Sequence, residues 1–432
     1  MKTIDLSKIN LNISENDKKR PMIFYAAGRF AKANIEILRE NGIVPVCFAD
    51  KDETKHGTVF CGYKICSLET ALKRYPDALV VLTYGKRNLT PLVREMAQIV
   101  DSELLRFPYD TYYGLGCDFL GTNITLFYNG TVGCCYGNRF VVPNVSFADP
   151  LDVLLPAHPN YSEKIIQKII AGEEQSCTGC KELKEGFWEI KPRVNCFVFT
   201  STLKGAKCNY DCPECSHGLK FKEKPQIDDQ NSLVASEILQ YFYDNYKNLN
   251  IRVDKMGVYC SLAIAEPVLL PDLNRILEIT DKSNNLLIPS LTTNGSVYSE
   301  RWVKSMVKNP KSFLICDISA GTVESYKKLK GVTCLDRVAD NLEKYVKAAL
   351  NPVQVRVKFT FFEGINDNFD DVNGFLEIVK RLRCKAEISN NMYAKLKITD
   401  KIGELYKYMV DELNRNNIVW ENNVCQRIAF ER

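Results

Sequence analysis

The chain has 432 residues, of which 45% are hydrophobic, and a formal net charge of +4. This length suits two or three domains. The modest and dispersed charge gives no reason to expect nucleic-acid binding. The sequence contains no run of 18 or more apolar residues, so no membrane span is expected. The N-terminus lacks the apolar core of a secretion signal. We therefore expect a cytoplasmic protein whose 17 cysteines stay reduced and serve partly as metal ligands.

The first hundred residues alternate between strand and helix patterns. Strands are expected at 22–26, 43–49 and 78–82. Gly28 opens the first helix, and Asp50 follows the second strand, where a dinucleotide-binding fold has the acid that binds a ribose hydroxyl. Residues 1–105 thus resemble a Rossmann-like domain. Since Gly28 is the one glycine left of a three-glycine loop, the pattern allows a nucleotide site or a role in packing or substrate presentation.

Four cysteines form the next pattern, two around a predicted hairpin and two in a turn after a predicted helix: Cys117, Cys135, Cys177 and Cys180. Asn129-Gly130 is the hairpin signal. The spacing resembles the start of a SPASM or twitch domain, and this resemblance implies one fully ligated auxiliary [4Fe–4S] cluster in residues 106–190. A four-cysteine zinc site needs the same number of ligands and is the alternative.

Six strand patterns alternate with six helical patterns farther along the chain. We expect the strands at 194–200, 256–263, 286–292, 312–319, 353–361 and 385–389. We expect the helices at 232–247, 271–281, 298–308, 322–329, 336–349 and 370–383. Such alternation predicts parallel β/α units. By analogy with closed barrels, functional side chains should then lie at the carboxyl ends of the strands.

A C-x3-C-x2-C triplet follows the first of these strands: Cys208, Cys212 and Cys215. Iron–sulfur clusters are usually held by four cysteines, so three thiolates leave one iron of a cubane open. A zinc site completed by His217 is the other interpretation, because zinc prefers four tetrahedral ligands. The triplet in this position resembles the radical SAM superfamily. The resemblance implies a partial (β/α)6 barrel over 191–395, in which the open iron binds S-adenosylmethionine.

Polar residues at the later strand ends extend this resemblance. Glu266-Pro267 is similar to the family's G-G-E-P segment, and Thr293-Asn294-Gly295 is similar to its T-N-G segment. Ser319 and Asn366 follow later strands, where the family has further polar contacts. The resemblance implies that Glu266, Asn294, Ser319 and Asn366 bind S-adenosylmethionine, with Glu266 receiving its ammonium group.

The predicted fold is α/β: a partial (β/α)6 radical SAM barrel preceded by a small SPASM/twitch-like cluster domain and a Rossmann-like domain, with a helical extension at 396–432. The predicted function is hydrogen abstraction from a peptide or carbohydrate substrate, with two [4Fe–4S] clusters, S-adenosylmethionine and an electron donor such as flavodoxin or ferredoxin. The alternative is a non-catalytic metal-binding scaffold with a nucleotide-binding domain. The metal content separates the two, because zinc without iron would exclude the enzyme.

Overall fold

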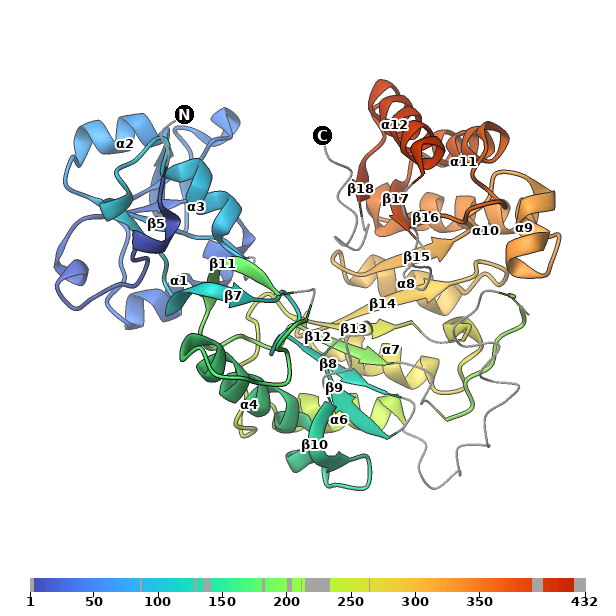
Figure 1. Cartoon of the computed structure of the whole chain (residues 1–432), viewed down its shortest axis with the longest axis horizontal. Coiled ribbons are helices and arrows are strands. Elements are labelled where there is room, and N and C mark those ends of the chain that lie inside the picture. Colours follow the sequence, from blue (N-terminus) through green and yellow to red (C-terminus); the bar gives the residue numbers. More distant parts are fainter. Residues whose placement is uncertain are drawn as a thin grey trace. The chain divides into compact units, whose positions relative to one another are not determined.

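The computed structural model describes residues 4–85, 88–127, 130–134, 141–180, 183–199, 204–210, 212–213, 234–263, 265–390 and 399–422 (Figure 1). The chain divides into two compact units. Unit 1 comprises Met1–Thr122, His158–Asn195 and Ile251–Met256, and unit 2 comprises Asn123–Ala157, Cys196–Asn250 and Gly257–Arg432. The residues predicted to form an auxiliary-cluster domain are thus distributed over both units. No described helix combines the length and the apolar character that crossing a bilayer requires.

A six-stranded sheet forms the framework of unit 1, in the order β3-β4-β2-β1-β5-β6. Its strands are β1 (Met22–Tyr25), β2 (Cys47–Ala49), β3 (Val59–Phe60), β4 (Tyr63–Cys66), β5 (Leu79–Leu82) and β6 (Leu105–Arg106). Its helices are α1 (Arg29–Glu40), α2 (Leu68–Arg74) and α3 (Thr90–Met96). Strand β1 pairs in parallel with β2 on one side and β5 on the other. The strand order therefore reverses at β1, the kind of position where open α/β sheets bind ligands.

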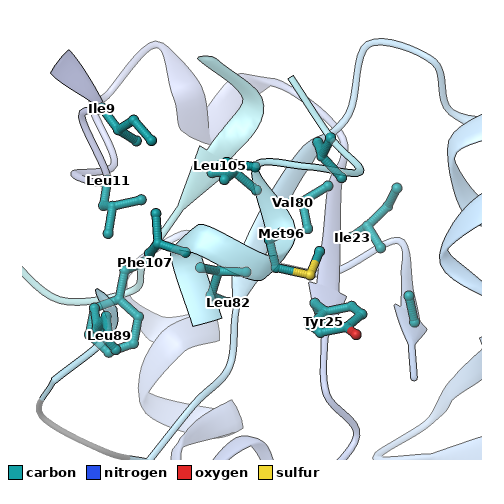
Figure 2. Close-up of a cluster of buried hydrophobic side chains, with 14 of the residues drawn as sticks. Ile9, Leu11, Ile23, Tyr25, Val80, Leu82, Leu89, Met96, Leu105 and Phe107 are labelled. Atoms are coloured by element: carbon teal, nitrogen blue, oxygen red, sulfur yellow. The ribbon is translucent and has the colours of Figure 1, made fainter. Parts of the chain in front are cut away.

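Both faces of this sheet are buried, which explains the unbroken apolar runs of its central strands. Ile23 and Val80 belong to one core cluster, shown in Figure 2, whereas Phe24 and Val81 belong to a second cluster. Unit 1 also has a two-stranded antiparallel sheet of β7 (Thr111–Gly116) and β11 (Lys184–Glu189). Helix α4 (Leu151–Ile170) begins in unit 2 and ends in unit 1.

A ten-stranded sheet forms unit 2, in the order β10-β9-β8-β12-β13-β14-β15-β16-β17-β18. The six predicted strands are β12 (Cys196–Phe199), β13 (Val258–Leu262), β14 (Leu287–Thr293), β15 (Phe313–Asp317), β16 (Val355–Phe361) and β17 (Lys385–Asn390). Neighbours in this series all pair in parallel. The predicted α/β class is therefore confirmed.

The sheet extends beyond the predicted series at both edges. The predicted hairpin is present as β8 (Asn123–Leu126) and β9 (Thr131–Gly133), followed by β10 (Val141–Ser146). Strand β8 pairs in parallel with β12, so the hairpin continues the same sheet. At the other edge, β18 (Trp420–Asn422) pairs in parallel with β17. The predicted C-terminal extension thus contains a strand in addition to its helix, α12 (Asp400–Arg415).

The helices that follow the parallel strands of unit 2 are α6 (Ala235–Asn245), α7 (Leu273–Lys282), α8 (Glu300–Lys308), α9 (Val323–Lys330), α10 (Leu335–Ala348) and α11 (Phe369–Leu382). Three of them begin at polar residues whose side chains cap the first turn, whereas α6 begins after Val234 and α10 after Cys334. Ser299, Thr322 and Asn368 each accept a hydrogen bond from a backbone N–H in the first turn of α8, α9 and α11, respectively. The loops between strand ends and these caps carry most of the residues that the sequence predicts to be functional.

Candidate functional site

The cysteine loop follows β12 and precedes α6. Cys208 is exposed and Cys212 is half-buried, whereas Cys215 lies outside the described residues. A loop that carries one exposed and one half-buried thiol can present both to an added metal centre. The donor set of the described loop therefore fits the iron–sulfur cluster implied by the resemblance.

Hydrogen bonds hold this loop against the ends of β13 and β14. Asn294 Nδ2 donates to Asn209 Oδ1 at 2.9 Å and lies 3.8 Å from Cys208 Sγ. Asn209 Nδ2 donates to Ser296 Oγ at 2.8 Å, and the backbone N–H of Glu266 donates to the carbonyl of Lys207 at 2.9 Å. The structure thus brings together Cys208, Glu266 and Asn294, three residues that the sequence predicts to share a site.

The Glu266 carboxylate is 1% exposed and caps the 3-10 turn Pro267–Leu269. It accepts from the Thr293 hydroxyl at 2.8 Å and from the backbone N–H groups of Asn294 and Val268 at 2.7 and 3.2 Å. Burial raises the pKa of Glu266, and these hydrogen bonds offset only part of that effect. A carboxylate offers about four lone-pair positions, and donors among the described residues occupy three of them.

Ser319 and Asn366 form a second group, at the ends of β15 and β16. Ser319 is fully buried with a φ of 46°; its hydroxyl donates to the Asp317 carboxylate and accepts from the Thr360 N–H at 3.0 Å. Asn366 Nδ2 donates to the carbonyls of Ser319 and Thr360 at 2.6 and 2.7 Å. Its Oδ1 accepts from the Phe362 N–H at 2.6 Å. These bonds hold a strained backbone in place, and contacts from either side chain to S-adenosylmethionine stay predictions.

Tyr210 lies between Cys208 and Cys212, and the sequence interpretation did not predict the contacts that its side chain makes. Its hydroxyl lies 2.9 Å from Cys334 Sγ and accepts from the Tyr326 hydroxyl at 3.2 Å. The two tyrosine rings meet edge to face, with centroids 6.4 Å apart. These contacts tie the middle of the cysteine loop to α9 and to the turn before α10. The available signal was a tyrosine inside the cysteine motif, between Asn209 and Asp211.

Lys330, at the end of α9, places a positive charge near the same loop. Its Nζ lies 3.4 Å from Asp317 Oδ1. Burial lowers the pKa of Lys330, but Asp317 and Cys212 outweigh burial, so the net shift is upward. A nearby cation stabilises a thiolate relative to a thiol. Lys330 therefore favours the deprotonated Cys212 that metal ligation requires.

The four cysteines of the predicted auxiliary cluster are described only in part. Cys117 and Cys177 are buried, Cys180 is half-buried, and Cys135 lies outside the described residues. The Cys180 N–H donates to the Cys177 carbonyl at 2.8 Å, which closes the predicted C-x2-C turn. Among the described residues, no three His, Cys, Asp or Glu side chains gather into a metal-binding group. The auxiliary cluster stays a prediction.

The glycine loop of unit 1 is closed by Asp50. Its carboxylate accepts from the backbone N–H groups of Ala27 at 2.9 Å and Asp52 at 3.0 Å, and from Lys55 Nζ at 2.9 Å. Burial opposes ionisation, but these donors outweigh it and lower the pKa of Asp50. A Cβ added at Gly28 would meet nothing within 4 Å, so the loop leaves open space there. Asp50 thus braces the loop, and its predicted contact with a ribose remains a prediction.

No family model and no curated protein match this sequence. Solved structures resemble part of the fold. SuiB of Streptococcus suis bound to S-adenosylmethionine is 14% identical, with a TM-score of 0.39 over 62% of this chain and 56% of that chain. A radical SAM methyltransferase from Sphaerobacter thermophilus is 12% identical, with a TM-score of 0.37 over 50% and 63% of the two chains. The protein anSMEcpe with bound AdoMet is 18% identical, with a TM-score of 0.37 over 54% and 64%.

This chain spans less than two thirds of the length of each of these three structures. All three likenesses lie below 20% sequence identity and below a TM-score of 0.5, so nothing about the activity of this chain follows from them. The likeness concerns the arrangement of strands and helices. The chemistry must be argued from the residues of this chain.

Proposed function

We propose that this protein is a radical SAM enzyme whose catalytic [4Fe–4S] cluster is held by Cys208, Cys212 and Cys215. One observation carries the proposal: Asn294 binds the cysteine loop through Asn209, and its backbone N–H binds Glu266. The described part of the cysteine loop, with Cys208, and two candidate ligands of S-adenosylmethionine therefore lie at the carboxyl ends of neighbouring parallel strands. When bound, the cluster and S-adenosylmethionine would supply a carbon-centred radical by reductive cleavage.

The protein's own groups would bind and orient the cofactor. Glu266 would bind the ammonium group, and Thr293 and Asn294 fix the direction of its carboxylate. Tyr210 and Lys330 would hold the cysteine loop and keep Cys212 as a thiolate. Because Glu266 is buried at the strand ends, its carboxylate has little contact with water, and this strengthens a charge-assisted hydrogen bond to a ligand.

The proposal extends to the auxiliary cluster, to the Rossmann-like part of unit 1 and to the substrate. Cys117, Cys135, Cys177 and Cys180 would hold an auxiliary [4Fe–4S] cluster for electron transfer. The Rossmann-like part would recognise or present a peptide or carbohydrate, and a flavodoxin or ferredoxin would donate the electron. The second candidate function is a non-catalytic metal-binding scaffold with a nucleotide-binding domain. Two observations support a nucleotide-binding domain in this scaffold: Asp50 holds the glycine loop, and a Cβ added at Gly28 would meet no atom within 4 Å.

Anaerobic purification and reconstitution with iron and sulfide test the proposal. The protein should be brown, should carry about eight irons per chain if two cubanes form, and should release 5′-deoxyadenosine from S-adenosylmethionine with dithionite. Zinc without iron, or iron without cleavage of S-adenosylmethionine, would contradict the enzyme and favour the scaffold. Matched reactions without dithionite give the background.

A further inference from the structure

Alternate residues of β15, β16 and β17 point to the face of the sheet opposite the helices. Phe359 of β16 packs against Phe375 of α11, with ring centroids 5.0 Å apart, so its strand neighbour Lys358 points the other way. The parallel register pairs Lys358 with Asp317 on one side and with Glu387 on the other. These three residues form a row of charges across three strands, which we call the charged row.

The charges around this row are mostly paired with one another. Asp317 Oδ1 lies 3.4 Å from Lys330 Nζ. Arg356 Nη1 lies 3.1 Å from Glu421 Oε1, and Lys385 pairs with the same glutamate. Each of these ion pairs satisfies a charge that would otherwise be costly to bury. Most of the charged groups on this polar face therefore have a partner within the protein.

Three buried polar atoms on this face lack a hydrogen-bond partner among the described residues: Glu387 Oε2, Thr360 Oγ1 and Arg356 Nε. Glu387 is 2% exposed and Thr360 is 5% exposed. Lys358 and Glu387 also form no ion pair within the described part of the chain. Folded proteins rarely leave such groups unpaired, because their desolvation is then uncompensated. Several unpaired atoms on neighbouring strands therefore indicate a polar ligand.

The surrounding charges decide which ligand fits. Burial raises the pKa of Glu387, while the nearby cations Lys358, Arg356 and Lys385 oppose that shift. The cations Lys358, Arg356 and Lys385 lie among the carboxylates Asp317, Glu387 and Glu421, so the attraction and repulsion of a charged ligand largely cancel. A neutral hydroxyl can use both signs, because it can donate to a carboxylate and accept from a cation.

We infer that the charged row and Thr360 bind the hydroxyl groups of a neutral, polyhydroxylated substrate. The inference rests on the proposed function and selects a carbohydrate over a peptide as the substrate class. Each hydroxyl of a sugar ring both donates and accepts, which matches the alternation of carboxylate, ammonium and hydroxyl groups across β15, β16 and β17. The row also lies on the strands whose carboxyl ends lead to Ser319 and Asn366, as expected for a substrate site in the same sheet.

Binding and stability measured on the reconstituted full-length protein test this inference. Saturation-transfer NMR would compare D-glucose and N-acetyl-D-glucosamine with glycylglycine and triglycine. We expect the sugars to bind and the peptides not to bind. Thr360→Val, which removes only the unpaired hydroxyl, should weaken sugar binding about tenfold and should leave the melting temperature unchanged or raised. Glu387→Gln should weaken sugar binding as well.

Thr280→Val is the matched control. Thr280 is also buried, but its hydroxyl donates to the Leu277 carbonyl at 3.1 Å, so this variant should lower the melting temperature and keep sugar binding. Peptide binding without sugar binding, undiminished sugar binding by Thr360→Val, or binding of none of the four probes would overturn the inference; the last result would leave ordered water as the partner of these atoms. Cleavage of S-adenosylmethionine by the same wild-type preparation reports separately on the proposed function.

Discussion

Replacing Asn366 with alanine should destabilise unit 2 strongly, although this residue was predicted as a cofactor ligand. Its side chain is fully buried and makes three hydrogen bonds of 2.6 to 2.7 Å, all to backbone groups. Two of these groups are the carbonyls of Ser319, which has a left-handed φ of 46°, and of Thr360. The amide therefore joins two strand ends that carry backbone strain.

The size of the effect follows from the three bonds. A typical intramolecular hydrogen bond contributes about 1 kcal/mol net, and a buried group left without a partner costs more. Asn366→Ala should therefore lower the free energy of unfolding by about 3 kcal/mol, before any cavity is counted. Asn366→Asp should be at least as damaging, because an oxygen would replace the amide nitrogen that faces two carbonyls.

Urea unfolding followed by circular dichroism measures this loss. Asn373→Ala is the control, because Asn373 is exposed on α11 and accepts a single bond from the Tyr408 hydroxyl; its cost should stay within about 0.5 kcal/mol. If Asn366→Ala unfolds within that same margin of the wild type, the side chain does not brace the strand ends. Its predicted contact with S-adenosylmethionine would then be the better explanation of its position.

Three further predictions concern other parts of the chain. Replacing Cys177 and Cys180 with alanine should remove about four irons per chain, leave reductive cleavage of S-adenosylmethionine largely intact and stop substrate turnover; zinc at these residues would contradict this. Burial opposes ionisation of Asp17, but bonds from Arg106 and a neighbouring serine hold its pKa at about 2. Ionised Asp17 should therefore contribute about 2 kcal/mol to the free energy of unfolding. This contribution should be complete above the usual pKa of 3.8 and be lost as the pH falls through 2. Asp17→Asn should abolish this part of the pH dependence of unfolding. Tyr326→Phe should speed the loss of iron to a chelator, because it removes a hydroxyl that holds the cysteine loop; an unchanged rate would show that the loop is held elsewhere.

The parallel strands of unit 2 could be predicted because their apolar runs are local patterns. A strand buried by helices on one side leaves a clear signal in the residues themselves, and the capping serine, threonine and asparagine residues mark where the helices begin. No local sequence pattern indicated that β8 pairs with β12. Pairing between segments distant in sequence depends on tertiary packing, which a local pattern does not contain.

The sequence was enough to select several residues of the candidate site, but not the hydrogen bonds that these residues make. The sequence interpretation selected Cys208, Glu266 and Asn294, which the structure places together. It did not foresee that the neighbours of Glu266 would be a threonine hydroxyl and two backbone N–H groups. It also missed Tyr210, whose partners Tyr326 and Cys334 lie more than a hundred residues away. Hydrogen bonds of this kind follow from the fold and not from spacing in the sequence.

Cleavage of S-adenosylmethionine by Cys212→Ala tests the central claim most directly. The wild type and the variant would be reconstituted anaerobically, assayed for iron and incubated with dithionite and S-adenosylmethionine. The three-cysteine cluster predicts that the variant forms no 5′-deoxyadenosine and keeps only the auxiliary iron, about four atoms per chain. Undiminished 5′-deoxyadenosine from Cys212→Ala would contradict the assignment of the catalytic cluster to this loop.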